Sequence, residues 1–131
     1  MGSFVFFGQH CHLENGSYVI DKIMNRIEQL LSFLAIDAND AFTLYSLAHE
    51  HKQAGEMEKA LAYFEELREK HPTYTGLYYH LGKVYEAIGE KEKGMAIFEI
   101  GVQIAEKQRD MHALAELRTL IVNREMGIEE D

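Results

Sequence analysis

The sequence has few of the residues that interrupt helices or cross-link chains. Its 131 residues include one proline, one cysteine and no tryptophan. A single proline leaves most segments free to form long helices, and the lone Cys11 excludes a disulfide within the chain. No apolar run approaches the roughly 18 residues that a membrane helix requires. We therefore expect one soluble domain of long helices, located by default in the cytoplasm.

The chain also lacks a basic segment. It carries 13 Lys and Arg against 22 Asp and Glu, a net charge of -9. Nucleic acids and anionic membranes attract basic surfaces, so we expect neither as a partner. The sequence contains no glycine-rich phosphate loop and no nucleophile elbow. We therefore predict no enzyme activity and no cofactor.

The sequence does contain an internal repeat with an offset of 34 residues. The stretch HKQAGEMEKALAYF begins at residue 51 and YEAIGEKEKGMAIF begins at residue 85. Over 32 ungapped positions nine residues are identical, among them Gly55 and Gly89. Glycine suits the left-handed backbone that ends a helix, and apolar residues recur at helical spacing on both sides of it. Each unit is therefore predicted to be two amphipathic helices joined by a tight turn.

These residues resemble the signature of the tetratricopeptide repeat, a helix-turn-helix unit of about 34 residues. The signature positions of the first unit (41–72) hold Leu44, Leu47, Ala48, His51, Ala60, Phe64 and Pro72. Those of the second unit (75–106) hold Tyr78, Leu81, Gly82, Tyr85, Gly94 and Phe98. The chain departs from the signature at His51, where Tyr is usual, and at Glu106, where Pro is usual. The resemblance implies an all-α fold, an α-solenoid of two repeats, like the short stand-alone bacterial members of the family.

The small residues of the signature and the segments outside the repeats complete this prediction. At Ala48, Gly82, Ala60 and Gly94 we expect helix backbones to approach closely. Two repeats leave their outer faces uncovered, so we expect capping helices over 22–36 and 109–125. Their apolar stripes are Ile27, Leu30, Leu31 and Leu34, and Leu114, Leu117, Leu120 and Ile121. Residues 1–21 fit no repeat and are predicted to form a flexible arm, and 127–131 to form an acidic tail.

Two histidine clusters raise the question of a metal site. His49-Glu50-His51 resembles a fragment of the zinc-protease motif H-E-x-x-H, but Gln53 stands at the position of the second histidine. Residues two apart on a helix point to nearly opposite sides, so we predict no metal here. His10-Cys11-His12 offers better ligands but lacks a fourth at a recognisable spacing. Metal binding by this triplet is a third, more distant hypothesis for the function.

The resemblance also implies a function, because the first helices of tetratricopeptide repeats line a concave groove that holds an extended peptide or a partner helix. Transferred by position, the groove residues are Phe42, Tyr45, His49 and Lys52 in the first unit and Gly76, Tyr79, Lys83 and Glu86 in the second. Tyrosine combines apolar area with a polar tip, as binding surfaces often do. We therefore predict a noncatalytic module that binds a protein or peptide.

Alternatives to this prediction remain open. The tyrosines could instead pack against neighbouring helices as core residues. The chain could also have a structural role through homo-oligomerisation, as a homodimer that pairs an uncovered helix face with its copy. Some family members grip a terminal carboxylate with Lys and Asn at fixed groove positions. Those positions hold Tyr45, His49, Tyr79 and Lys83 here, so that specialised function is not predicted.

Overall fold

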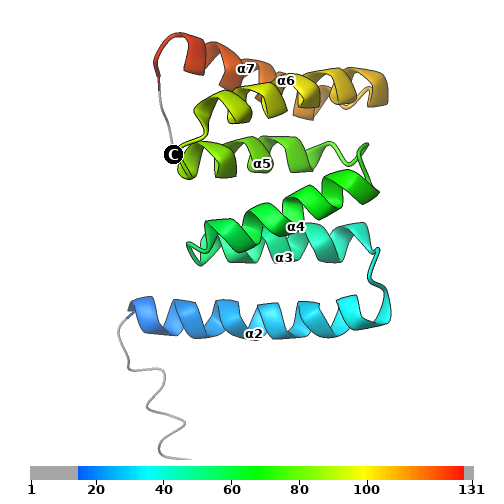
Figure 1. Cartoon of the computed structure of the whole chain (residues 1–131), viewed down its shortest axis with the longest axis vertical. Coiled ribbons are helices and arrows are strands. Elements are labelled where there is room, and N and C mark those ends of the chain that lie inside the picture. The colour runs from blue at the N-terminus through cyan, green and yellow to red at the C-terminus, as the bar shows by residue number, and fades with distance from the viewer. Residues whose placement is uncertain (1–14, 129–131) are drawn as a thin grey trace, which may run out of the picture.

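The computed structural model describes residues 15–128, which form six α-helices and no strand, stacked one above another (Figure 1). The helices are α2 (Asn15–Ile36), α3 (Ala41–Gln53), α4 (Met57–Lys70), α5 (Gly76–Ala87), α6 (Lys91–Gln108) and α7 (Met111–Glu125). Each helix packs mainly on its neighbours along the chain, with α3 on α4 and α5 on α6. The predicted all-α solenoid is therefore confirmed. Within the described range, no helix has the length and apolar character needed to cross a membrane.

The same hydrogen-bonded turn closes the first helix of each repeat. Gly55 and Gly89 have φ angles of 82° and 90°, which confirms the predicted left-handed conformation. The Glu56 N–H donates to the carbonyl of His51 at 2.9 Å, and the Glu90 N–H donates to that of Tyr85 at 2.8 Å. These bonds, together with one from each glycine N–H to the carbonyl three residues before it, satisfy carbonyls that a helix end leaves unpaired. The glycines are conserved between the units because other residues are strained at this φ.

The helices of the second repeat approach closely at glycines, as expected. A Cβ built on Gly82 would lie 2.1 Å from Cε1 of Phe98 on α6, and one on Gly94 would lie 2.8 Å from the carbonyl oxygen of Gly82. In the first repeat, Ala48 and Ala60 are completely buried. Contacts of this kind leave no room for an added carbon, because protein interiors are densely packed.

The N-terminal capping helix is longer than predicted. α2 begins at Asn15 rather than at residue 22, so residues 15–21 belong to a helix and not to a flexible arm. Ile27 and Leu30 are buried against Leu47 of α3, in agreement with the predicted stripe. Leu31, in contrast, is 42% exposed, because no helix within the described range covers that side of α2. Residues 1–14 and 129–131, with His10-Cys11-His12 and most of the acidic tail, lie outside the described residues.

The helix α7 does not continue the offset of 34 residues that relates the two repeats. In α5 the buried side chains include Leu77, Tyr78, Leu81 and Val84, and in α7 they are Ala113, Leu114, Leu117 and Leu120. The same burial pattern therefore returns after 36 residues. The added length lies in α6, which has 18 residues where α4 has 14. α7 thus packs as the first helix of a further unit, and its bounds, Met111–Glu125, fall within the segment 109–125 for which a capping helix was expected.

Polar contacts at both ends of α7 fix it against α5. Near its start, the Thr75 hydroxyl donates to the carboxylate of Asp110, the N-cap residue, at 2.6 Å. Near its end, the Arg124 guanidinium donates to both carboxylate oxygens of Glu86, at 2.7 and 3.1 Å. The Glu86 and Arg124 side chains are only 18% and 10% exposed. Between these contacts, α5 and α7 face each other across an open hollow.

Candidate binding groove

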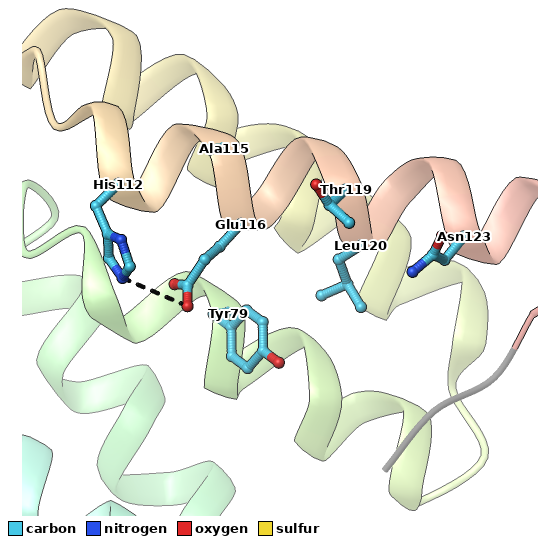
Figure 2. Close-up of a pocket in the computed structure, with 7 residues that line it drawn as sticks. All are labelled: Tyr79, His112, Ala115, Glu116, Thr119, Leu120 and Asn123. Atoms are coloured by element: carbon cyan, nitrogen blue, oxygen red, sulfur yellow. Dashed lines mark ion pairs between the residues drawn. The ribbon is translucent and has the colours of Figure 1, made fainter.

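The side chains on one face of α3, α5 and α7 form a continuous surface, which we call the groove. Between α5 and α7 this surface is hollowed to a volume of about 380 Å³. Tyr79 of α5 forms one wall, and α7 supplies the rest of the lining, including His112, Glu116 and Asn123 (Figure 2). Figure 2 also shows Glu116 turned toward His112, with 3.5 Å between Oε2 and Nε2. The hollow is wide and open, as a surface for a protein segment would be.

Aromatic rings fill the part of the groove between α3 and α5. The ring of Tyr45 lies 5.2 Å from that of Tyr74, 5.8 Å from that of His80 and 6.2 Å from that of His49, centroid to centroid. His80 stacks parallel to the buried Phe64 at 6.1 Å. These contacts hold the rings in place, and the half-buried Tyr45 and Tyr74 still reach the surface. Burial raises the pKa of both tyrosines, so they stay neutral.

Positive charge collects beside these rings. The Lys52 ammonium, from the end of α3, lies 3.1 Å from Nδ1 of His80 on α5. The Lys83 ammonium lies over the ring of Tyr79, 5.1 Å from its centroid. Burial lowers the pKa of Lys52, and the nearby charge of Lys83 lowers it further. The two lysines thus come from different repeats but share one part of the groove.

His80 is held neutral in this setting. Burial lowers its pKa from 6.5 to about 3, with Lys52, His49 and Lys83 adding to the effect. Because an ammonium can only donate, Nδ1 of His80 must accept the hydrogen bond from Lys52, and the ring proton resides on Nε2. Burial and Lys52 also lower the pKa of His49. The part of the groove between α3 and α5 therefore brings together the ammonium groups of Lys52 and Lys83 and two imidazoles, His49 and His80, whose pKa is lowered.

We expect His80 to make the fold less stable in mild acid. Between pH 6.5 and about 3 the folded state binds fewer protons at His80 than the unfolded state, so stability falls as pH falls. The loss at His80 should reach about 2 kcal/mol by pH 5, relative to pH 7. Urea unfolding of the wild type and of His80→Gln at both pH values measures it. Between pH 7 and pH 5 the variant should lose about 2 kcal/mol less unfolding free energy than the wild type. Equal losses would show that His80 does not have a lowered pKa in the folded protein.

The structure brings together most, but not all, of the residues predicted from the repeat signature. Tyr45, His49 and Lys52 from α3 meet the α5 side chains around His80, and Tyr79 and Lys83 lie beside them. Their role in binding stays a prediction. The cluster does not include the other three predicted groove residues.

Phe42, Gly76 and Glu86 stand apart from that central cluster. Phe42 is 67% exposed at the start of α3. Gly76 begins α5 and offers only its backbone, close to the rings of Tyr74 and Tyr45. Glu86 binds Arg124, so its carboxylate serves to attach α7. Among the predicted groove residues, Glu86 is therefore the one with an evident structural task.

Sequence reasoning missed several groove residues. His80 lies next to Tyr79, at a position that the signature does not assign to the groove, and it contacts Lys52 from 28 residues earlier. His112, Glu116 and Asn123 were assigned to a cap and not to the groove. The burial pattern that recurs after 36 residues would have identified the face of α7, had the repeat been extended with that offset.

The two histidines of the His49-Glu50-His51 motif point to different parts of the molecule, as predicted. His51 is buried, stacks on Tyr63 at 5.5 Å and shares a hydrogen bond of 2.8 Å with Glu56. His49 faces the groove, where its ring lies 5.3 Å from that of His80. Within residues 15–128, no group of three or more His, Cys, Asp and Glu side chains is placed to hold a metal ion.

Comparison with known proteins identifies the class of protein that this arrangement of helix pairs defines. The family model described as tetratricopeptide repeat matches residues 51–117. The chain therefore belongs to the tetratricopeptide repeat family. Repeats of this family generally mediate protein–protein interactions and are generally noncatalytic.

Individual relatives agree with this assignment. Over 91 residues the chain is 30% identical to the TPR repeat-containing protein YpiA of Bacillus subtilis; the match covers 69% of this chain but only 22% of YpiA. A tetratricopeptide repeat domain protein from Salinibacter ruber is 39% identical, with a TM-score of 0.64 over 69% of this chain and 99% of that one. PcrH, solved with the chaperone binding region of PopD, shares the fold with a TM-score of 0.72 at 15% identity, over 88% of each chain.

Proposed function

We propose that this chain is a noncatalytic binding module that holds an extended peptide or a partner helix in the groove of α3, α5 and α7. The observation that carries the proposal is the set of polar and aromatic side chains that gather on this face and remain partly exposed there. The Lys83 ammonium, for example, lies over the ring of Tyr79, which lines the hollow and keeps part of its surface exposed. The complex of PcrH with a segment of PopD supports the proposal by analogy of fold.

The geometry favours a segment over a small molecule. The hollow beside Tyr79 is open along its length, and the aromatic cluster around Tyr45 extends the surface toward α3. Small-molecule sites usually enclose most of their ligand. An open surface of amphipathic rings instead suits a chain laid across successive helices.

Replacing the centre of the groove should abolish partner capture. We expect the triple variant Tyr45→Ala, His49→Ala, Lys83→Ala to retain its helical circular dichroism but to bind the partner at least about tenfold more weakly, because a few central residues carry most binding energy. The measurement is affinity capture from a lysate of the source organism, with quantitative mass spectrometry. A surface triple variant, Glu58→Ala, Lys59→Ala, Glu92→Ala, is the control, since these side chains are exposed at the starts of α4 and α6. Equal recovery by wild type and groove variant would contradict the proposal.

A second candidate is self-association through the end helices. Phe33 and Ile36 of α2 are 56% and 85% exposed, and Val122 of α7 is 49% exposed with Met126 beyond it at 67%. Solenoids leave such end faces uncovered, and a second copy could cover them. Light scattering over a range of concentrations separates the candidates, because self-association predicts a dimer whose formation the groove variant does not change.

A further inference from the structure

We propose that residues 4–7, Phe-Val-Phe-Phe, dock on an exposed apolar patch of their own chain, formed by Phe33, Ile36 and Phe42 at the α2 end of the groove. The docking is independent of the function proposed above. Its consequence rests on that function, because a partner segment has to displace this internal ligand to reach the α2 end of the groove.

The patch gathers large apolar side chains that the described helices leave uncovered. The chain has seven phenylalanines, of which two are completely buried in the core. Phe33 and Phe42 are 56% and 67% exposed, and Ile36, one helical turn after Phe33, is 85% exposed. The other three phenylalanines lie within residues 4–7. Exposed apolar groups that cluster on a surface mark a place where another segment binds.

Helix geometry brings the three side chains of the patch together. Arg26 and Phe33 are seven residues apart, so they lie on one side of α2. Arg26 reaches Glu50 of α3, with 3.0 Å between Nε and Oε2. The two helices pack on each other in opposite directions (Figure 1), so Phe33, two turns later on α2, lies beside the start of α3, where Phe42 stands. Ile36 neighbours Phe33 at the spacing of three residues.

Phe42 joins the patch to the groove. It precedes His49 by seven residues, so both side chains lie on the same side of α3. His49 faces the groove, where its ring lies 5.3 Å from that of His80. A segment bound to the patch therefore occupies one end of the surface that we propose for a partner.

The length of chain before α2 matches the distance to the patch. α2 begins at Asn15, and the patch lies near the other end of this helix (Figure 1). From Asn15 to Phe33 the helix rises by about 27 Å, at about 1.5 Å per residue. The chain from Phe7 to Asn15 spans about 26 Å when it is extended. An extended segment that runs back along α2 therefore places residues 4–7 at the level of the patch.

The tether favours this occupant over a separate molecule. A short linker holds its segment at an effective concentration of about a millimolar, which a peptide or a second copy in dilute solution does not reach. Successive side chains of an extended segment point to opposite sides, so Phe4 and Phe6 face the patch together. Their contact removes apolar area of both partners from water, which drives the docking.

The absence of tryptophan from the chain allows a direct test. Phe6→Trp in the full chain places a single fluorophore in the segment. Its emission and its quenching by acrylamide are measured in this parent, in the parent with Phe33→Ser and Phe42→Ser, and in a control, the parent with Val122→Ser and Met126→Ser. The control side chains are 49% and 67% exposed at the end of α7, so similar apolar groups are removed away from the patch.

We expect the tryptophan of the parent and of the control to emit at shorter wavelength than that of the patch variant. It should also be quenched about threefold less efficiently, because docking shields the ring from water and quencher. This protection should not change over about a hundredfold range of protein concentration, since the contact lies within one chain. Equal quenching in the three proteins, or protection that grows with concentration and so places the segment on a second copy, would overturn the docking.

The consequence for the groove has its own readout. In the lysate capture described above, Phe4→Ser with Phe6→Ser should raise recovery of the partner about threefold, because the binding surface is no longer partly occupied. A protected tryptophan with unchanged recovery would keep the docking and overturn the competition. Failure of the wild type and of this variant to capture any partner would count against the proposed function and the competition, whereas the fluorescence decides the docking.

Discussion

Gly82→Ala should destabilise the protein by about 2 kcal/mol. The new Cβ would lie 2.1 Å from Cε1 of Phe98, a fully buried ring on the neighbouring helix, so α5 and α6 must move apart. Overpacking of this kind costs about 1 to 3 kcal/mol or more, which outweighs the gain of about 1 kcal/mol from replacing a helical glycine. The measurement is the free energy of unfolding in urea.

Gly76→Ala is the matched control for this substitution. Gly76 also lies in α5, but a Cβ there would meet its nearest neighbour, Cε1 of Tyr74, at 3.7 Å, an ordinary contact. Alanine at this position should leave stability unchanged or raise it by up to about 1 kcal/mol. If Gly82→Ala were as stable as Gly76→Ala, the close approach of the two helices at Gly82 would be wrong.

Glu86→Gln should cost about 3 kcal/mol. It leaves the Arg124 guanidinium, which is 10% exposed, without the carboxylate that it contacts through two nitrogens. Removing one partner of a buried ion pair costs about 3 to 5 kcal/mol, and the slight exposure of this pair places it at the lower end. Urea unfolding measures the loss, and hydrogen exchange should show that it is greatest in α7.

An exposed ion pair gives the control for Glu86. Arg118 and Glu106 approach to 2.6 Å with side chains 57% and 50% exposed, so Glu106→Gln should change stability by less than about 0.5 kcal/mol. A loss for Glu86→Gln no larger than that for Glu106→Gln would show that this pair does not hold α7 in place.

The sequence predicts best the positions where the backbone conformation or a close approach of two backbones requires glycine. Gly55 and Gly89 were predicted to be left-handed, and both are, because few other residues adopt that conformation without strain. Gly82 was predicted to lie at a close approach, and it does. Arg109, in contrast, ends α6 with φ of 58°, and nothing in a long charged side chain indicates that conformation.

The features that sequence did not predict depend on contacts between distant segments. The low pKa of His80 needs Lys52 from another repeat and burial set by Phe64. Nothing in the sequence shows that α6 is longer than α4. The change from an offset of 34 residues to one of 36, which turns one face of α7 toward the groove, was therefore not predicted. Leu31 was assigned to the buried stripe of α2 because periodicity identifies an apolar side but not how much of it a partner covers.

Site-specific photo-crosslinking tests the central claim, binding in the groove, most directly. A photoreactive phenylalanine analogue would replace Tyr45 or Tyr79 in the groove, or Ala62 or Ile100, which line the surface between α4 and α6. The four proteins are irradiated in a lysate of the source organism and examined for products of higher mass. We predict a discrete crosslinked partner from the two groove positions and none from the α4 and α6 positions; crosslinks confined to α4 and α6 would contradict the account.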